Sequence, residues 1–62
     1  MELHVYVYTN DDRRKRSVGD VIKPGYYPQE GESFIFRSMT LCVKDVYIDY
    51  DAMVYKVICD EV

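Results

Sequence analysis

The sequence predicts an all-β domain, built as a small five-stranded antiparallel barrel or curled sheet with a long C-terminal hairpin. Three observations predict it. Val, Ile and Tyr, which favour pleated strands, recur in short runs; turn-forming residues separate these runs; and no run has the apolar spacing of a helix. The 62 residues make one domain. A chain of this size buries only about 60% of its unfolded surface, so its stability is marginal without help from disulfides, a metal or a partner chain.

The last third of the chain is the best-specified element. Residues 41–50 and 53–60 are rich in Val, Ile and Tyr, so they are typical of the two arms of an antiparallel hairpin. The turn signal between them, Asp51-Ala52, is weak because Ala disfavours positive φ, and a longer loop remains an alternative.

The register of this hairpin follows from the residues that each alternative would pair. A two-residue loop gives apolar pairs on the inward face and mixed pairs on the other: Tyr50 with Met53, Ile48 with Tyr55 and Val46 with Val57 inward, and Tyr47 with Lys56 and Asp49 with Val54 outward. A loop one residue longer sets Val46 opposite Lys56, and a one-residue slip exchanges the two faces of a strand. We therefore expect the first register.

The apolar alternation changes phase within the first arm. Leu41 and Val43 have one phase, and Val46 has the other. One inserted residue near Lys44-Asp45 would reconcile them, and such a β-bulge bends a strand as a small barrel requires.

The two cysteines, Cys42 and Cys59, fall on opposite faces in this register, so no disulfide is expected. Only a loop one residue longer would bring them opposite each other. Met1 leads directly into strand-like sequence without a charged and apolar leader, which favours a cytoplasmic protein with reduced thiols. We interpret both cysteines as small, mostly buried apolar side chains.

The N-terminal residues 2–8 alternate cleanly and predict the first strand. One face carries Leu3, Val5 and Val7, and the other carries His4, Tyr6 and Tyr8. Because neither face is polar, the second face is expected either to be partly covered in a closed barrel or to join an oligomer interface. Residues 9–12, Thr-Asn-Asp-Asp, form a turn or cap cluster.

The basic run Arg13–Arg16 is interpreted as a mobile loop, because a helix there would have no apolar stripe to bury. A strand around residues 17–23 follows, with Val18, Val21 and Ile22 packed on the body of the domain.

Turn signals divide the middle of the chain. They predict, in order, a type II turn at 23–26, a second turn at 28–31, a strand at 33–37 and a tight link at 38–40. In the first turn Gly25 would supply the positive φ. In the strand Phe34 and Phe36 share one face, and Ile35 lies on the other.

The outline and length of the chain resemble the SH3-like small barrels. The pattern Pro28-x-x-Gly31-Glu32, followed by Val43-x-x-Val46 and a final hairpin, is also similar to uncharacterised small bacterial and phage β-proteins. This resemblance covers roughly the second half of the chain. It implies a fold and no activity.

Charge is distributed unevenly along the chain. The formal net charge is −3, from 8 basic and 11 acidic residues. Half of the basic charge lies in Arg13–Arg16, and the rest of the chain has 4 basic against 11 acidic residues, a balance of −7. This acidic body argues against non-specific binding of nucleic acid by the whole domain.

The basic run is the sharpest functional feature, because guanidinium groups grip phosphates and neighbouring tyrosines can stack on bases. The candidate binding residues are Arg13, Arg14, Lys15, Arg16, Tyr6, Tyr8, Tyr26 and Tyr27. A basic run of this kind can equally meet an acidic patch on a protein or on a second copy of the chain, or it can be a solvated loop tethered by Asp11, Asp12 and Asp20. We expect a module that binds another macromolecule, with a protein partner or self-association ahead of nucleic acid.

Catalytic, metal and cofactor sites are not expected. His4 is the sole histidine and has no partner at metal-ligand spacing, and no positioned nucleophile accompanies it. The chain contains no phosphate-binding glycine loop and no Cys-x-x-Cys pair, and a barrel this small leaves little room for a substrate pocket. No apolar run approaches the roughly 18 residues of a membrane span.

The acidic zone of the hairpin has two interpretations. It comprises Asp45, Asp49, Asp51, Asp60 and Glu61. Such charges keep a strand edge soluble and discourage aggregation. They could also imitate the phosphate backbone for a partner that binds nucleic acid.

Overall fold

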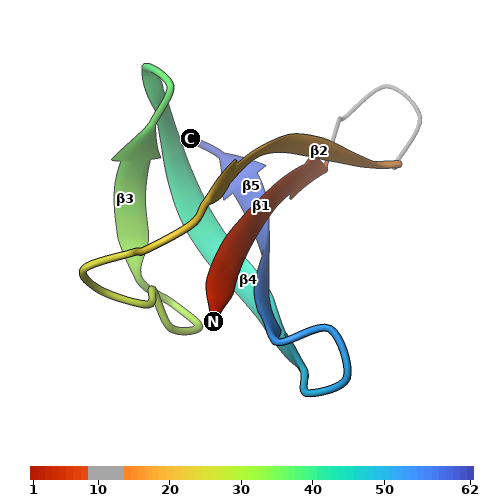
Figure 1. Ribbon diagram of the computed structural model, residues 1–62. Helices are drawn as coiled ribbons and strands as arrows, with labels where there is room; N and C mark the ends of the chain where they lie inside the picture. Colours follow the sequence, from red (N-terminus) through yellow and green to blue (C-terminus); the bar gives the residue numbers. More distant parts are fainter. Residues whose placement is uncertain (9–13) are drawn as a thin grey trace.

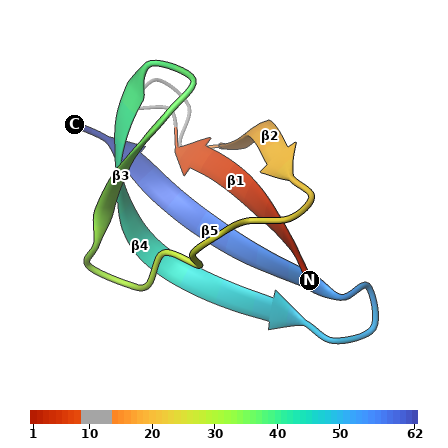
Figure 2. The same cartoon turned by 60° about the vertical axis from the view of Figure 1, so that its left-hand side comes forward.

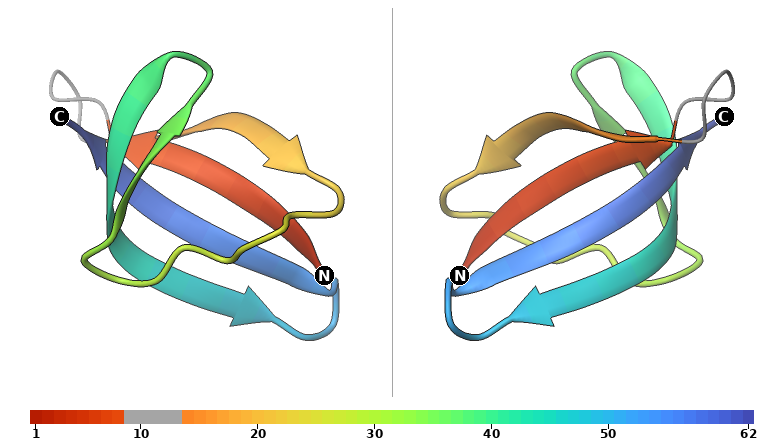
Figure 3. Two further views of the ribbon diagram at one scale, coloured as in Figure 1. Left: turned by 90° about the vertical axis from the view of Figure 1, so that its left-hand side faces the viewer. Right: turned by 90° about the vertical axis from the view of Figure 1, so that its right-hand side faces the viewer.

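The computed structural model describes residues 1–8 and 14–62, which form five strands and no helix (Figure 1). The strands are β1 (Glu2–Tyr8), β2 (Lys15–Val21), β3 (Ser33–Phe36), β4 (Met39–Asp49) and β5 (Val54–Glu61). They form one sheet in the order β2-β1-β5-β4-β3. The sheet curls into a half-barrel, and the connection from β2 to β3 runs across β5 (Figures 2 and 3). The predicted all-β fold is confirmed.

One pairing departs from the antiparallel prediction. β1 and β5 pair in parallel at the centre of the sheet, whereas the other three pairs are antiparallel. Hairpin patterns report only on neighbours along the chain, so they carry no information about how the first and last strands meet.

The register of the C-terminal hairpin is confirmed. Val46 pairs with Val57, Ile48 pairs with Tyr55, and the pairing shifts between Val43 and Asp45, where the bulge was expected. The turn at 50–53 contains four residues but keeps the register of the two-residue loop.

The geometry of this turn explains the weak signal at Asp51-Ala52. Met53, and not Ala52, has positive φ, at 55°. The Oδ1 atom of Asp49 accepts hydrogen bonds from the backbone N–H groups of Asp51 and Ala52, each at 3.0 Å. The side chain thus caps the turn that the central residues specify only weakly.

The core lies on the concave face of the sheet. Its buried members are Leu3, Val5, Val7, Leu41, Val43, Val57 and Cys59, and half-buried Val18, Val21, Phe34, Phe36, Met39, Val46 and Tyr55 pack against them. The inward face predicted for residues 2–8 and the shared face of Phe34 and Phe36 are confirmed. Cys42 and Cys59 are both free thiols, as the register predicted.

The tip of the hairpin is an exception to the predicted inward face. Ile48, Tyr50 and Met53 are exposed, and Tyr50 keeps 73% of its surface accessible. β1 begins opposite Val54, so the tip extends past the start of the neighbouring strand and these side chains stay accessible.

The prediction of a loop over the basic run is wrong for its second half. Lys15 and Arg16 already belong to β2, because β1 is long enough to pair Tyr8 with Lys15 and Val7 with Arg16. β2 ends at Val21, so Ile22 is 72% exposed and does not pack on the body as expected. Arg13 and the turn expected at 9–12 lie outside the described residues.

Two turns also differ from the predictions. Gly25 does not have positive φ; the turn with type II geometry lies at 29–32, where Gly31 has φ 88° and the Glu32 N–H donates to the Gln29 carbonyl at 3.0 Å. The link between β3 and β4 is Arg37-Ser38, with φ of 50° and 66°, rather than residues 38–40. Positive φ at two non-glycine residues leaves no turn signal in the sequence.

The two edges of the sheet meet at Gly19. A Cβ atom on this residue of β2 would lie 2.7 Å from Arg37 Nε and 3.0 Å from Phe36 Cζ, and its φ of 151° suits glycine. Side chains therefore close the half-barrel where hydrogen bonds between strands do not.

Within residues 1–8 and 14–62, no helix has the length and apolar character that crossing a membrane requires.

Candidate binding surface on the outer face of the sheet

The outer face of the sheet carries a second apolar cluster. Side chains alternate along a strand, so Ile58 points away from the core that Val57 and Cys59 join. Ile58 is nevertheless only 2% exposed. Its partner on β1 is Tyr6, which is half-buried on the same face. Aromatic and charged side chains of the outer face thus cover an aliphatic residue.

These residues form the floor of an open hollow of about 690 Å³. The residues that line it are Tyr6, Lys15, Tyr47, Ile48, Asp49, Tyr50, Asp51, Lys56 and Ile58. The Lys15 ammonium lies over the Tyr47 ring, 5.7 Å from its centroid. β1 and β5 separate the strands of these two residues. Their contact across two strands shows that the twisted outer face is hollowed along this diagonal.

The charges around the hollow are partly matched. Lys56 Nζ lies 3.9 Å from Asp49 Oδ2, and the other oxygen of Asp49 accepts the two backbone hydrogen bonds of the turn. For Lys15, none of the described carboxylates lies within ion-pair distance. The hollow therefore combines aromatic walls, an aliphatic floor and one ammonium whose charge is not neutralised by those carboxylates.

The structure brings together only part of the predicted binding set. Tyr6 and Lys15 line the hollow, and Tyr8 pairs with Lys15 on the same face. Arg16 pairs with the core residue Val7, so it points to the other face of the sheet. Arg14 is exposed directly before β2.

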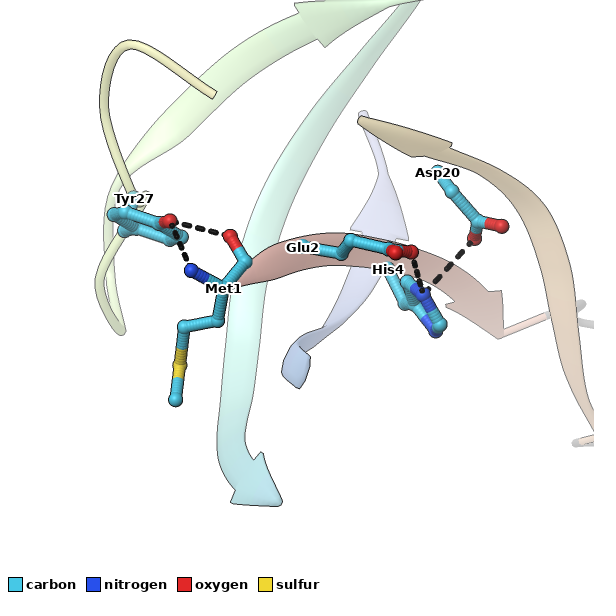
Figure 4. A network of polar contacts seen from close by, with 5 residues as sticks. All are labelled: Met1, Glu2, His4, Asp20 and Tyr27. Carbon is cyan, nitrogen blue, oxygen red and sulfur yellow. Dashed lines mark hydrogen bonds and ion pairs between the residues drawn. The ribbon is translucent and has the colours of Figure 1, made fainter. Parts of the chain in front are cut away.

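Tyr26 and Tyr27 lie elsewhere, on the connection between β2 and β3. The Tyr27 ring packs edge-to-face on Tyr55 with centroids 5.0 Å apart, and its hydroxyl donates to the Met1 carbonyl (Figure 4). Tyr26 donates to the Glu32 carboxylate at 2.9 Å, and this hydrogen bond raises the pKa of Tyr26.

Tyr55 completes the attachment of this connection. Its hydroxyl donates to the Pro28 carbonyl at 2.9 Å, and burial, aided by the nearby Glu32 charge, raises the pKa of Tyr55. Tyr27 and Tyr55 thus attach the connection to the sheet, whereas the Tyr26 hydrogen bond lies within the connection. Neither Tyr26 nor Tyr27 lines the hollow.

His4 belongs to a small polar network on the outer face. Its Nε2 lies 3.2 Å from Glu2 Oε1 and 3.8 Å from Asp20 Oδ1, so it links β1 to β2 (Figure 4). In the part of the chain that the structure describes, no three His, Cys, Asp or Glu side chains gather as a metal site.

Sequence reasoning missed most of the lining that comes from the hairpin. Ile48 and Tyr50 were assigned to the core, and Tyr47 and Lys56 were noted only as an outward pair. The available signal was the apolar residue Ile58, which is out of phase with Tyr55, Val57 and Cys59. A strand that is apolar on both faces predicts a second buried surface.

Comparison of the chain with protein-family models, with curated proteins and with solved structures gave no match.

Proposed function

We propose that this protein is a non-enzymatic interaction module whose outer-face hollow receives an apolar side chain of a partner protein. The observation that carries the proposal is the aromatic hollow above Ile58, built on the face opposite the core. Its volume, about 690 Å³, falls within the range of about 300–1,000 Å³ typical of ligand sites.

The rim of the hollow supports a protein partner. Tyr47 is 55% exposed, and Ile48 and Tyr50 are also accessible beside it. Tyrosines with accessible rings are favoured anchors in protein interfaces. A contiguous exposed apolar patch with charged residues at its edge is typical of an interaction surface. A second copy of the chain is included among the partners, because the exposed hairpin tip presents apolar side chains of its own.

The lining suits binding rather than catalysis. It contains tyrosine, lysine, isoleucine and aspartate, and Asp49 is already engaged by Lys56 and by the turn. The two free thiols fit a reducing compartment, so the proposal places the protein in the cytoplasm.

A nucleic-acid module is the second candidate, favoured by the position of Lys15 between aromatic side chains and next to Arg14. Stacking of single-stranded bases on Tyr6 and Tyr47 would use the same hollow. Asp49 and Asp51 on its far rim oppose a phosphate backbone, so the protein partner ranks first.

Selection from a displayed library of random peptides tests the proposal. Selected peptides are expected to shift the amide resonances of residues that line the hollow, and to bind Tyr47→Ala at least roughly tenfold more weakly, as loss of an aromatic anchor implies. Ile35→Ala is the matched control, since Ile35 is 77% exposed on β3 and does not line the hollow. Peptides that bind the two variants equally well would contradict the proposal.

Fluorescence anisotropy with labelled single- and double-stranded oligonucleotides tests the second candidate. Binding that weakens steeply with salt and disappears in Lys15→Gln would put nucleic acid in first place. Absence of binding at low salt would remove it.

A further inference from the structure

We infer that the segment received by the hollow presents a carboxylate beside its apolar group, and that Lys15 receives this carboxylate. The inference rests on the proposed function, because it names the ligand chemistry of the same hollow. The partner segment is therefore expected to carry an acidic residue next to a bulky apolar residue.

The position of the Lys15 ammonium is the first argument. It lies 5.7 Å from the centroid of the Tyr47 ring, above the apolar lining, and no carboxylate of residues 1–8 and 14–62 pairs with it. An ammonium beside aromatic and aliphatic groups loses part of its hydration, so an incoming anion gains more there than at a fully solvated lysine.

The balance of the other charges is the second argument. Lys56 and Asp49 neutralise each other at 3.9 Å. Asp51 lies in the turn, at the end of the hollow away from the backbone of Lys15, which pairs with Tyr8 at the far end of β1. Arg16 points to the other face of the sheet, so it does not contribute to the charge of the hollow. The carboxylates that line the hollow, Asp49 and Asp51, both lie toward its turn end, so a negative ligand group is favoured beside Lys15.

The floor of the hollow supplies the apolar half of the recognition. Ile58 is buried and Tyr6 is half-buried beneath Lys15 and Tyr47. A ligand with an apolar body and an anionic end can place the body against the accessible side chains of Tyr47 and Ile48 while its carboxylate reaches the ammonium. A simple inorganic anion would leave the accessible apolar surface of Tyr47, Ile48 and Tyr50 uncovered.

Three matched probes test this inference: 4-phenylbutyrate, 4-phenylbutanamide and 4-phenylbutylamine. They share one apolar body and differ in the charge of the end group. Titration of the isotope-labelled protein, followed by two-dimensional amide NMR, gives the binding site and the dissociation constant of each probe. We expect the carboxylate to bind ~3–10-fold more tightly than the amide at low salt, and the amine to bind most weakly.

Two variants separate the roles of charge and surface. Lys15→Gln should bind the carboxylate and the amide equally, whereas Lys23→Gln, which changes an exposed lysine outside the hollow, should keep the preference. Tyr47→Ala should weaken all three probes together. Both lysines are exposed, so neither change endangers folding.

The outcomes distinguish this inference from the proposed function. Equal binding of all three probes at the hollow would overturn the carboxylate preference and leave the binding site in place. Tightest binding of the amine would also overturn it and would assign the charge recognition to Asp51. Absence of any perturbation at the hollow would overturn the binding site itself, and the proposed function with it.

Discussion

The two faces of β1 and β5 are made by alternate residues of the same strands, yet they differ in chemistry. The inner face is apolar and mostly buried, with Val5, Val57 and Cys59 at its centre and half-buried Tyr55 beside them. The outer face buries two aliphatic residues of β5, Val54 and Ile58, and Ile58 lies under tyrosine and lysine side chains that remain accessible. The inner face thus provides the stability of the domain, and the outer face provides a surface with groups available to a ligand.

This difference matters because the domain is small. Among the described residues, no polar or charged side chain is buried, so apolar packing holds the inner face together. The same strands position the side chains of the outer face, but those side chains are not required for the strands to form. Changes on the two faces should therefore separate stability from binding.

The largest expected effect comes from breaking the inner face. Leu41→Ala should lower the free energy of unfolding by about 2–5 kcal/mol, since Leu41 is fully buried and its removal leaves a cavity. Tyr47→Ala should cost less than about 1 kcal/mol, because that side chain is mostly accessible. Urea unfolding followed by circular dichroism measures both. Comparable losses for the two variants would show that the outer face belongs to the core.

The pH dependence of stability should also report on the inner face. Burial, with smaller contributions from Cys42 and Asp60, raises the pKa of the Cys59 thiol to about 11. Above pH 9 the thiol of the unfolded chain ionises while the folded thiol stays protonated. Stability should therefore fall as pH rises from about 9 to 11, by at most about 2–3 kcal/mol.

A Cys59→Val variant isolates this contribution, because the raised pKa values of Tyr26 and Tyr55 act in the same direction. The variant should lose less stability over the same pH interval in thermal unfolding scans.

A thiol reagent should modify half-buried Cys42 in the folded protein and reach Cys59 only on unfolding. Equal reactivity of the two thiols would count against the buried position of Cys59.

The side-chain contact between the edge strands β2 and β3 can be tested by adding one methyl group at Gly19. Gly19→Ala should destabilise the protein by about 1–2 kcal/mol, because the new methyl group would meet Arg37 and Phe36 in a backbone conformation that disfavours side chains. Gly25→Ala is the matched control, with no atom within 4 Å of the added Cβ and no positive φ. If both variants melt at the same temperature, the edges of the sheet do not meet as described.

The smallest expected effect is a gain. Ser38 has φ of 66° in the turn between β3 and β4, so Ser38→Gly should relieve strain and stabilise the protein by up to about 1 kcal/mol. Ser33→Gly, in the extended strand β3, should instead destabilise it by roughly 0.5–1 kcal/mol. The midpoint of thermal unfolding measures both changes, and a loss of stability in Ser38→Gly would contradict the turn geometry.

Much of the local structure could be predicted. The alternation in residues 2–8 predicted the buried face of β1, and the pairing choices in the last third predicted the register of β4 with β5 and its bulge at Lys44-Asp45. The failures have two different causes. The link at Arg37-Ser38 carries no glycine, and the boundary of β2 depended on the length of β1, which is another part of the chain.

The candidate hollow could be predicted only in fragments. The predicted binding set includes Tyr6 and Lys15, which line the hollow, but it also includes Tyr26 and Tyr27, which lie on the connection attached to Tyr55. A single sequence shows which residues are aromatic or charged, and it does not show which of them a curled sheet brings together.

The sequence by itself determined the strands, the alternating faces and the hairpin register, because side-chain period and turn chemistry act between residues that are close along the chain. Only the tertiary structure decided the parallel pairing of β1 with β5, the contact between Gly19 and Arg37 and the approach of Lys15 to Tyr47. These features depend on how far the whole sheet twists and curls. That curvature is the summed result of packing across all five strands, so no local pattern encodes it.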